Sequence, residues 1–401
     1  MKKRLFLFLF MCVIVKLGAQ TDMTDRIVNP SFEDKATGWD IRKMSVQGND
    51  AFNLKVGKYY VESWRPPGDR AQDCSGKQMI NNLPAGTYTV TAVAQNIQQN
   101  DPSAPQTGVW IYANGDKIEV SQPGDYKVTT TTVDGTLEIG FLIKGATGNY
   151  VCVDNFRLTQ EVPTEETYKI FREEIGKLVK EGEELNKHLS TPEQVALDEA
   201  LADGKALINN TSTKDVIEVC TALRTAIFNY RFSLASSDNP LDMTSYMKNP
   251  GFEDSTKDWI NSGFGSQTNT AFNLKVGTYY CEIWGAVNDS EIYQYVNLPN
   301  GNYRLTVVGQ NVQQSNMSAE QSGAYVYAND VKAKVSFPRQ YSLNFVVVDK
   351  VAKIGFNTLK CTGNYVCVDD FHLYYLGCDE DAQFAAFNQM ITNGEALMSS
   401  H

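Results

Sequence analysis

The chain has 401 residues, of which 42% are hydrophobic and 21% are charged, a composition typical of a folded globular protein with two or three domains. Its formal net charge at pH 7 is −11. This acidity disfavours nucleic acid and anionic membrane surfaces as partners, and it leaves uncharged partners such as polysaccharides open.

Residues 1–19 have the pattern of a secretory signal peptide. Three basic residues at positions 2–4 precede an apolar stretch, residues 5–15, that is too short to span a membrane. We expect cleavage after Ala19 and a secreted, cell-surface or periplasmic location. No later apolar run is long enough for a transmembrane helix, so no membrane insertion is predicted.

Two segments of the chain, 20–160 and 238–377, are copies of one another and are called module 1 and module 2 below. The octamer TGNYVCVD, for example, occupies both 147–154 and 362–369. Repeats of this length indicate that one structural unit is used twice.

Each copy alternates polar and apolar residues over short runs. Residues 86–94 and 137–143 alternate in this way, and Gly and Asn cluster at the breaks between runs. Many short strands separated by such turns predict an antiparallel β-sandwich of the jelly-roll type in each module.

Between the modules, residues 161–237 change to a period of about 3.6, which predicts helices. We expect one helix to begin at Thr164, a second to begin in a capping box at Thr191, and a third to begin near Ser212. A further helical segment is expected within 378–401. The predicted fold is mainly β, with two jelly-roll sandwiches separated by a three-helix bundle and followed by a short C-terminal helix.

The sequence contains no recognisable catalytic motif. It has three histidines, and it lacks the metalloprotease, nucleophile-elbow and phosphate-loop patterns. Glu62 and Glu282 lie at matching positions, but a single glutamate on a strand is more often structural than catalytic. We therefore predict that the protein is not an enzyme.

Aromatic side chains alternate with small apolar ones in one strand of each module. If Val109 and Ile111 face the core, Trp110 and Tyr112 face away from it. In module 2, Tyr325 and Tyr327 face away in the same manner. Such rings can stack on the apolar face of a pyranose while amides bond its hydroxyls; alternatively, they pack under a loop or the linker.

Two further tryptophans end a strand beside a loop that differs in length between the modules. The candidate ligand-binding residues are Trp110, Tyr112, Gln95 and Trp64 in module 1, and Tyr325, Tyr327, Gln310 and Trp284 in module 2. Trp39 and Trp259, near the first strand of each module, are expected in the core.

The octamer contains a change of strand parity. Val151 and Val153 are expected to face inward, and so are Phe156 and Leu158. The inward positions therefore change from odd to even residue numbers, which predicts a bulge that re-aims the carboxylate of Asp154. A buried carboxylate needs a partner, and either calcium or loop N–H groups could supply it.

Cysteine pairing is left open by the sequence. Seven cysteines remain after the signal peptide, and a Cys361–Cys367 clip and free buried thiols are both compatible with their spacing.

Three motifs occur in both modules: Asn-Pro-x-Phe-Glu near the start, Leu-Pro-x-Gly-x-Tyr at a strand opening, and Val-Asp-[Asn/Asp]-Phe in the last strand. Together they resemble bacterial carbohydrate-binding modules of the galactose-binding-domain-like jelly-roll type. This resemblance implies a structural calcium ion held by the Glu of the first motif and the Asp of the last. Carried over, the metal ligands are Glu33 with Asp154, and Glu253 with Asp369. The helical segment resembles the FIVAR-like bundles that space modules in bacterial surface proteins.

The sequence thus predicts a secreted, non-catalytic carbohydrate-binding protein whose tandem modules attach bivalently to a polysaccharide or glycan. One alternative is an adhesion or assembly protein that binds a cell-surface protein partner. The other is the ancillary region of a longer glycoside hydrolase.

Overall fold

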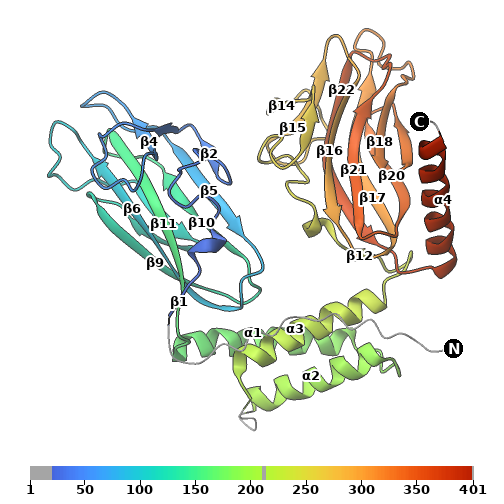
Figure 1. The fold of residues 1–401 in the computed structure, drawn as a ribbon, viewed down its shortest axis with the longest axis horizontal. Coiled ribbons are helices and arrows are strands. Elements are labelled where there is room, and N and C mark those ends of the chain that lie inside the picture. Colours follow the sequence, from blue (N-terminus) through green and yellow to red (C-terminus); the bar gives the residue numbers. More distant parts are fainter. Residues whose placement is uncertain (1–19, 210–213, 400–401) are drawn as a thin grey trace. The chain divides into compact units, whose positions relative to one another are not determined.

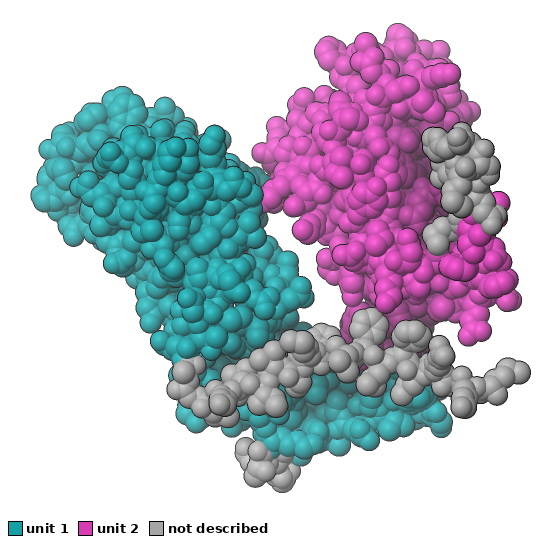
Figure 2. Space-filling view, in the orientation of Figure 1, with its two compact units in different colours: residues 1–227 teal, residues 228–401 magenta. Residues whose placement is uncertain are grey.

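The computed structural model describes residues 20–209 and 214–399 (Figure 1). The chain divides between Ile227 and Phe228 into two compact units, which Figure 2 shows in different colours. The expected signal peptide and the expected helix start near Ser212 lie outside the described residues.

Module 1 is a sandwich of two antiparallel sheets. The first, called sheet A, has the strand order β3 (Ser45–Gln47), β4 (Tyr60–Trp64), β11 (Tyr150–Gln160), β6 (Gly86–Ile97) and β9 (Gly124–Thr132), and β1 (Thr21–Asp22) pairs with β11. The second, sheet B, has the order β2 (Asp40–Arg42), β5 (Cys74–Ile80), β10 (Leu137–Ile143), β7 (Val109–Ala113) and β8 (Asp116–Glu119). A short 3-10 helix, η1 (Thr24–Arg26), follows β1.

Module 2 repeats this topology. Its sheet A has the order β14 (Gly265–Gln267), β15 (Tyr280–Trp284), β22 (Tyr365–Tyr375), β17 (Gly301–Val312) and β20 (Arg339–Val347), with β12 (Leu241–Asp242) paired to β22. Its sheet B has the order β13 (Ile260–Ser262), β16 (Ser290–Asn297), β21 (Val351–Thr358), β18 (Ala324–Ala328) and β19 (Val331–Val335), and η2 (Thr244–Tyr246) follows β12. The predicted pair of β-sandwiches is confirmed.

The apolar positions of the alternating runs form the core of each sandwich. In module 1, Tyr88 and Val90 from β6 pack in one cluster with Ile139 and Phe141 from β10, and all four are buried. Trp39 is buried as predicted, and its Nε1 donates to the carbonyl oxygen of Asn29 at 3.1 Å. Because the indole N–H is satisfied inside the core, this tryptophan is structural.

The predicted bulge is present in the last strand. The register between β11 and β6 shifts between Asp154 and Arg157, and Asn155 adopts a φ of 52°. Asparagine tolerates this left-handed conformation better than most residues. In module 2 the corresponding residue, Asp370, has a φ of 55°.

The linker contains the three predicted helices, α1 (Glu165–Leu185), α2 (Pro192–Ile208) and α3 (Val216–Ser233). Thr164 and Thr191 cap α1 and α2. Val195, in the first turn of α2, is 52% exposed. The inward position of that turn is occupied by the buried Gln194, whose amide donates to Asn186 and Asp198.

Each end of the linker packs on the neighbouring module. Thr167 of α1 shares a hydrogen bond of 2.8 Å with Thr87 of β6. At the other end, the ring of Phe232 stacks on Tyr375 of β22 with centroids 4.0 Å apart. The C-terminal helix, α4 (Glu380–Ser399), contacts β20 and β17 of module 2.

All seven cysteines in the described residues are free thiols. The Cys361–Cys367 clip is not formed; Cys361 Sγ instead lies 3.2 Å from Asn311 Oδ1. Among the described helices, none has both the length and the apolar composition needed to cross a membrane.

Candidate functional site

An exposed tryptophan ends strand β4 on the outer side of sheet A. Successive side chains of a strand point to opposite faces, so Tyr60, Glu62 and Trp64 all point away from the core into which Val61 is packed. Phe52, from the loop between β3 and β4, covers Tyr60, which is fully buried. Trp64 lies beyond this cover and is 51% exposed.

The indole of Trp64 is held in place by two amides. Trp64 Nε1 donates to Gln99 Oε1 at 2.9 Å, and Asn149 Nδ2 donates to the same oxygen at 2.9 Å. Asn149 Oδ1 in turn accepts from the backbone N–H of Gln99 at 2.7 Å. Asn149 is fully buried, so the exposed ring is anchored to the interior. We call Glu62, Trp64, Gln99 and Asn149 the tryptophan rim of module 1.

Module 2 repeats this arrangement. Trp284 is 68% exposed, and its Nε1 donates to Gln314 Oε1 at 2.9 Å. Asn364 Nδ2 donates to the same oxygen at 3.3 Å, and Asn364 Oδ1 accepts from Gln314 N at 2.8 Å. With Glu282, these residues form the tryptophan rim of module 2.

Replacing Asn149 with alanine is expected to destabilise module 1 and to release its indole. The change removes the Gln99 bonds and a further bond of Asn149 Nδ2 to Arg65 O, which leaves buried groups unpaired at a cost of about 1–3 kcal/mol. Chemical denaturation measures this loss, and tryptophan anisotropy measures the mobility of the ring. The matched Asn364→Ala variant should act on module 2 alone; unchanged stability in both variants would contradict this account.

A buried pair of phenols lies beside the rim. Tyr60 Oη is 3.0 Å from Tyr150 Oη, and it also lies 2.7 Å from Asn49 Oδ1 and 3.1 Å from Glu62 Oε2. Burial raises the pKa of Tyr60 to about 12 and raises that of Tyr150 as well. Both phenols therefore keep their protons at neutral pH, and the network orients the Glu62 carboxylate next to Trp64.

The amide of Gln95 is buried on the outer side of sheet A and does not lie beside Trp110. Gln95 is 6% exposed, and its Nε2 lies 3.4 Å from the sulfur of Cys152. The prediction that this amide accompanies Trp110 and Tyr112 is wrong, because β6 and β7 belong to different sheets. Outward-pointing residues on the two sheets lie on opposite sides of the sandwich. The same correction applies to Gln310, which is 3% exposed and contacts Cys367.

Trp110 and Tyr112 do point away from the core, on sheet B. They line a shallow depression of about 190 Å³ together with Asn114, Lys117 and Leu142. Lys117 Nζ lies 4.8 Å from the Trp110 ring centroid, and Tyr112 Oη donates to Glu138 at 3.1 Å. This face offers two half-buried rings, one of them beside a cation.

In module 2, Tyr325 and Tyr327 also point away from the core but differ in accessibility. Tyr325 is half-buried, with Lys332 Nζ 4.7 Å from its centroid. Tyr327 is only 6% exposed, because its Oη donates to Glu291 at 2.6 Å and Lys353 lies over its ring. The ring face of Tyr327 is therefore poorly placed for stacking.

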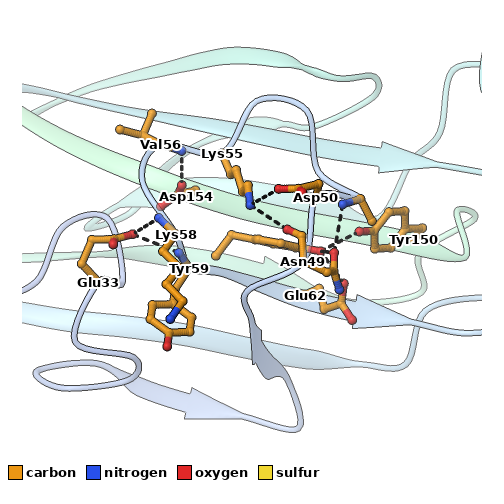
Figure 3. Close-up of polar contacts among 12 residues, drawn as sticks. Glu33, Asn49, Asp50, Lys55, Val56, Lys58, Tyr59, Glu62, Tyr150 and Asp154 are labelled. Atoms are coloured by element: carbon orange, nitrogen blue, oxygen red, sulfur yellow. Dashed lines mark hydrogen bonds and ion pairs between the residues drawn. The ribbon is translucent and has the colours of Figure 1, made fainter.

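The predicted metal-ligating carboxylates anchor the loop between β3 and β4. Glu33 Oε1 accepts from the backbone N–H of Lys58 at 2.8 Å and of Tyr59 at 3.0 Å (Figure 3). Asp154 Oδ2 accepts from Val56 N at 2.6 Å. In module 2, Glu253 and Asp369 hold the equivalent loop. These bonds match the predicted alternative in which loop N–H groups partner the carboxylate.

Calcium fits the ligand type and charge of each carboxylate pair. Burial, with a contribution from Glu33, raises the pKa of Asp154 to about 7, and a cation between the two groups would offset both effects. The described residues hold no group of three or more His, Cys, Asp or Glu side chains arranged for a metal. Calcium would therefore draw its other ligands from carbonyl oxygens or water, and the loop N–H bonds already use part of the acceptor capacity.

Sequence reasoning identified Trp64 and Trp284 but missed the residues that fix them, Gln99 and Asn149 with their counterparts. The available signal was the repeat itself, because Gln-Asn-x-Gln-Gln occurs at 95–99 and again at 310–314. Asn149 and Asn364 belong to the octamer. A polar stretch kept in both copies indicates a shared structural or binding role.

No family profile matches the chain, and no curated protein matches it. Solved structures similar to it include TmCBM61 in complex with β-1,4-galactotriose, with 22% identity over 32% of this chain and 97% of that one and a TM-score of 0.27. The tandem CBM22-1–CBM22-2 domain of Paenibacillus barcinonensis Xyn10C has 9% identity over 90% of this chain and 99% of that one, with a TM-score of 0.25. A cyclase from Fischerella sp. TAU has 15% identity over 36% of this chain and 100% of that one, with a TM-score of 0.28. Likenesses with such low TM-scores do not decide between binding and catalysis, so the chemistry of the site must do so.

Proposed function

We propose that this protein is a non-catalytic carbohydrate-binding protein that binds a glycan at the tryptophan rim of each module. The observation that carries the proposal is the exposed indole of Trp64, fixed by Gln99 and Asn149 and repeated at Trp284. Two copies that differ at many surface positions share this arrangement.

The chemistry of the rim suits an uncharged sugar. A half-exposed indole offers a flat apolar surface on which the C–H face of a pyranose can stack. Glu62 lies two residues away on the same face of β4 and can accept hydrogen bonds from hydroxyl groups. The bonds to Gln99 Oε1 orient that amide, so its Nε2 can donate to the ligand. Because the ring is already held, little side-chain entropy is lost on binding.

Two rims in one chain favour attachment to a polymer. A single rim offers one ring and a few polar groups, which implies weak binding. Two sites on one chain raise the effective concentration of the second site once the first is occupied. We therefore propose that the repeat serves bivalent attachment to a polysaccharide or to a glycan-coated surface.

A glycan array probed with the full mature chain tests the proposal. Binding to one class of glycans would support it. No binding across plant, host and microbial glycans by a demonstrably folded protein would contradict it, and would favour the adhesion alternative with a protein partner.

Calcium is part of the proposal as a structural ion at Glu33 with Asp154 and at Glu253 with Asp369. The ion would tie the loop between β3 and β4, or its equivalent in module 2, to the last strand. Added calcium is expected to raise the melting temperature of the chelator-treated protein, and the Glu33→Gln plus Glu253→Gln variant should lose this increase. An identical melting temperature with calcium and with chelator would contradict the calcium proposal and leave the N–H anchors as the explanation.

Export is proposed from residues 1–19 of the sequence. N-terminal sequencing of the protein from its native host tests it. A mature chain that begins at Gln20 is the expected result, and an intact N-terminus would contradict it.

A further inference from the structure

The outer face of sheet B differs in charge between the two modules. Gln78 and Gln294 make the same bonds, each to the backbone N–H and carbonyl of one residue, Val28 and Lys248 respectively. They therefore occupy equivalent positions, and the outward neighbours of Gln78 can be compared directly with those of Gln294.

Module 2 carries more aromatic rings on this face. Tyr293 and Tyr295 flank Gln294, where module 1 has Lys77 and Met79 around Gln78. Tyr295 is 62% exposed, and its ring lies edge-on to that of Tyr293 with centroids 5.6 Å apart. With Tyr325 on β18, these rings form an aromatic face, which we call the tyrosine face.

A glycine in the middle of this face leaves room for the neighbouring tyrosine rings. Gly355 lies between Tyr293 and Tyr327 in the register of the sheet. A Cβ atom at this position would lie 2.7 Å from the Tyr327 Oη and 2.6 Å from the Tyr293 Cβ. The absence of a side chain lets the flanking rings come together across β21.

The charges on this face favour an anion. The strands of sheet B in module 2 carry three lysines, Lys332, Lys334 and Lys353, and one acidic residue, Glu291. The same strands of module 1 carry three basic and four acidic residues. In the register of the sheets, Lys334 and Lys353 replace Glu119 and Glu138. A basic face on a chain with a net charge of −11 is a local departure from the overall charge.

The lysines lie close to the rings. Lys332 Nζ lies 4.7 Å from the centroid of Tyr325, and Lys353 Nζ lies 4.0 Å from that of Tyr293. Lys334 forms an exposed ion pair of 2.7 Å with Glu320, which contributes little and can be replaced by a ligand carboxylate. A tyrosine ring with a lysine beside it matches an acidic sugar. The ring can stack on the apolar face of the sugar, and the lysine can pair with the sugar's carboxylate.

We propose that the tyrosine face of module 2 binds an acidic polysaccharide of the polyuronate class, with the pyranose rings on Tyr295 and Tyr325 and the carboxylates at Lys332 and Lys334. These two lysines point to the same side of β19, two residues apart, so successive uronate rings of one chain can reach both. The site lies on sheet B, whereas the tryptophan rim lies on sheet A, and it does not depend on glycan binding at the rim.

Affinity electrophoresis of the full mature chain in polygalacturonate gels tests the proposal. The key variant is Lys332→Glu with Lys334→Glu, and the matched control is Lys77→Glu with Lys117→Glu in module 1, which changes the net charge by the same amount. The key variant should weaken polygalacturonate binding by about tenfold or more, since it removes two attractive charges and adds two repulsive ones. The control should leave binding within about twofold, and added salt should weaken the wild type.

Tyr325→Ala and a dextran sulfate gel complete the test. Loss of polygalacturonate binding in Tyr325→Ala, without a comparable loss for dextran sulfate, supports a sugar site in which the ring contributes. Equal losses in the key variant and the module 1 control would overturn the proposal, as would a wild type that migrates unretarded. Retardation by dextran sulfate alone would also overturn it, because it would reflect general charge attraction.

Discussion

The variant with both Trp64→Ala and Trp284→Ala is expected to lose measurable glycan binding while remaining folded. Removing one stacked indole should cost about 2 kcal/mol of binding free energy, or about thirtyfold in affinity at that site. Each single variant should retain monovalent binding and lose the gain from bivalency. Isothermal titration calorimetry with an oligosaccharide measures the sites, and binding to the polymer measures the bivalent gain.

Trp110→Ala is the control for this prediction, because Trp110 is a partly exposed indole on the opposite sheet of module 1. It should leave oligosaccharide affinity unchanged. If Trp110→Ala and Tyr325→Ala abolish binding to neutral glycans while Trp64→Ala and Trp284→Ala do not, the rim account is contradicted and the neutral-glycan site lies on sheet B.

In the presence of a chelator, each module is expected to become less stable as the pH rises from about 4 to about 7. Burial raises the pKa of Asp154 and of Asp369 from 3.8 to about 7 in the folded protein. Between these values the folded state binds more protons than the unfolded state, so the free energy of unfolding falls with rising pH and levels off above about pH 7. The loss has an upper limit of about 4 kcal/mol per module.

Chemical denaturation at a series of pH values measures this dependence. Asp154→Asn and Asp369→Asn should flatten the curve of their own module, since an amide does not titrate. Calcium should flatten it as well, because a bound cation favours the ionised carboxylates. A pH dependence in chelator that is the same in the wild type and in the Asp154→Asn and Asp369→Asn variants would show that the two aspartates do not titrate in this range, contrary to this account.

Much of the fold could be predicted from the sequence because the local patterns agree with the global structure. The strand alternation of 86–94, the capping threonine Thr191 and the parity change at Asp154 are each decided by neighbouring residues. Strand alternation and helix caps can each be recognised in a short stretch of sequence.

The composition of the site was harder to predict, since it depends on which strands share a sheet. Gln95 and Trp110 both point away from the core, yet they lie on different sheets, and alternation alone cannot distinguish the two. Asn149 holds Gln99 across 50 residues of sequence, a long-range pairing that no local pattern reveals. The exposure of Trp64 likewise depends on where the loop carrying Phe52 ends.

The most direct test of the central claim is a titration of the ¹⁵N-labelled protein with an oligosaccharide identified on the array, followed through the indole N–H resonances of its five tryptophans. Trp39 and Trp259 are buried in the cores, whereas Trp64, Trp284 and Trp110 report on the two rims and on sheet B of module 1. Binding at the rims predicts that the Trp64 and Trp284 resonances shift while the other three stay in place. A shift of Trp110 with Trp64 and Trp284 unmoved would contradict the account and place the site on the opposite sheet.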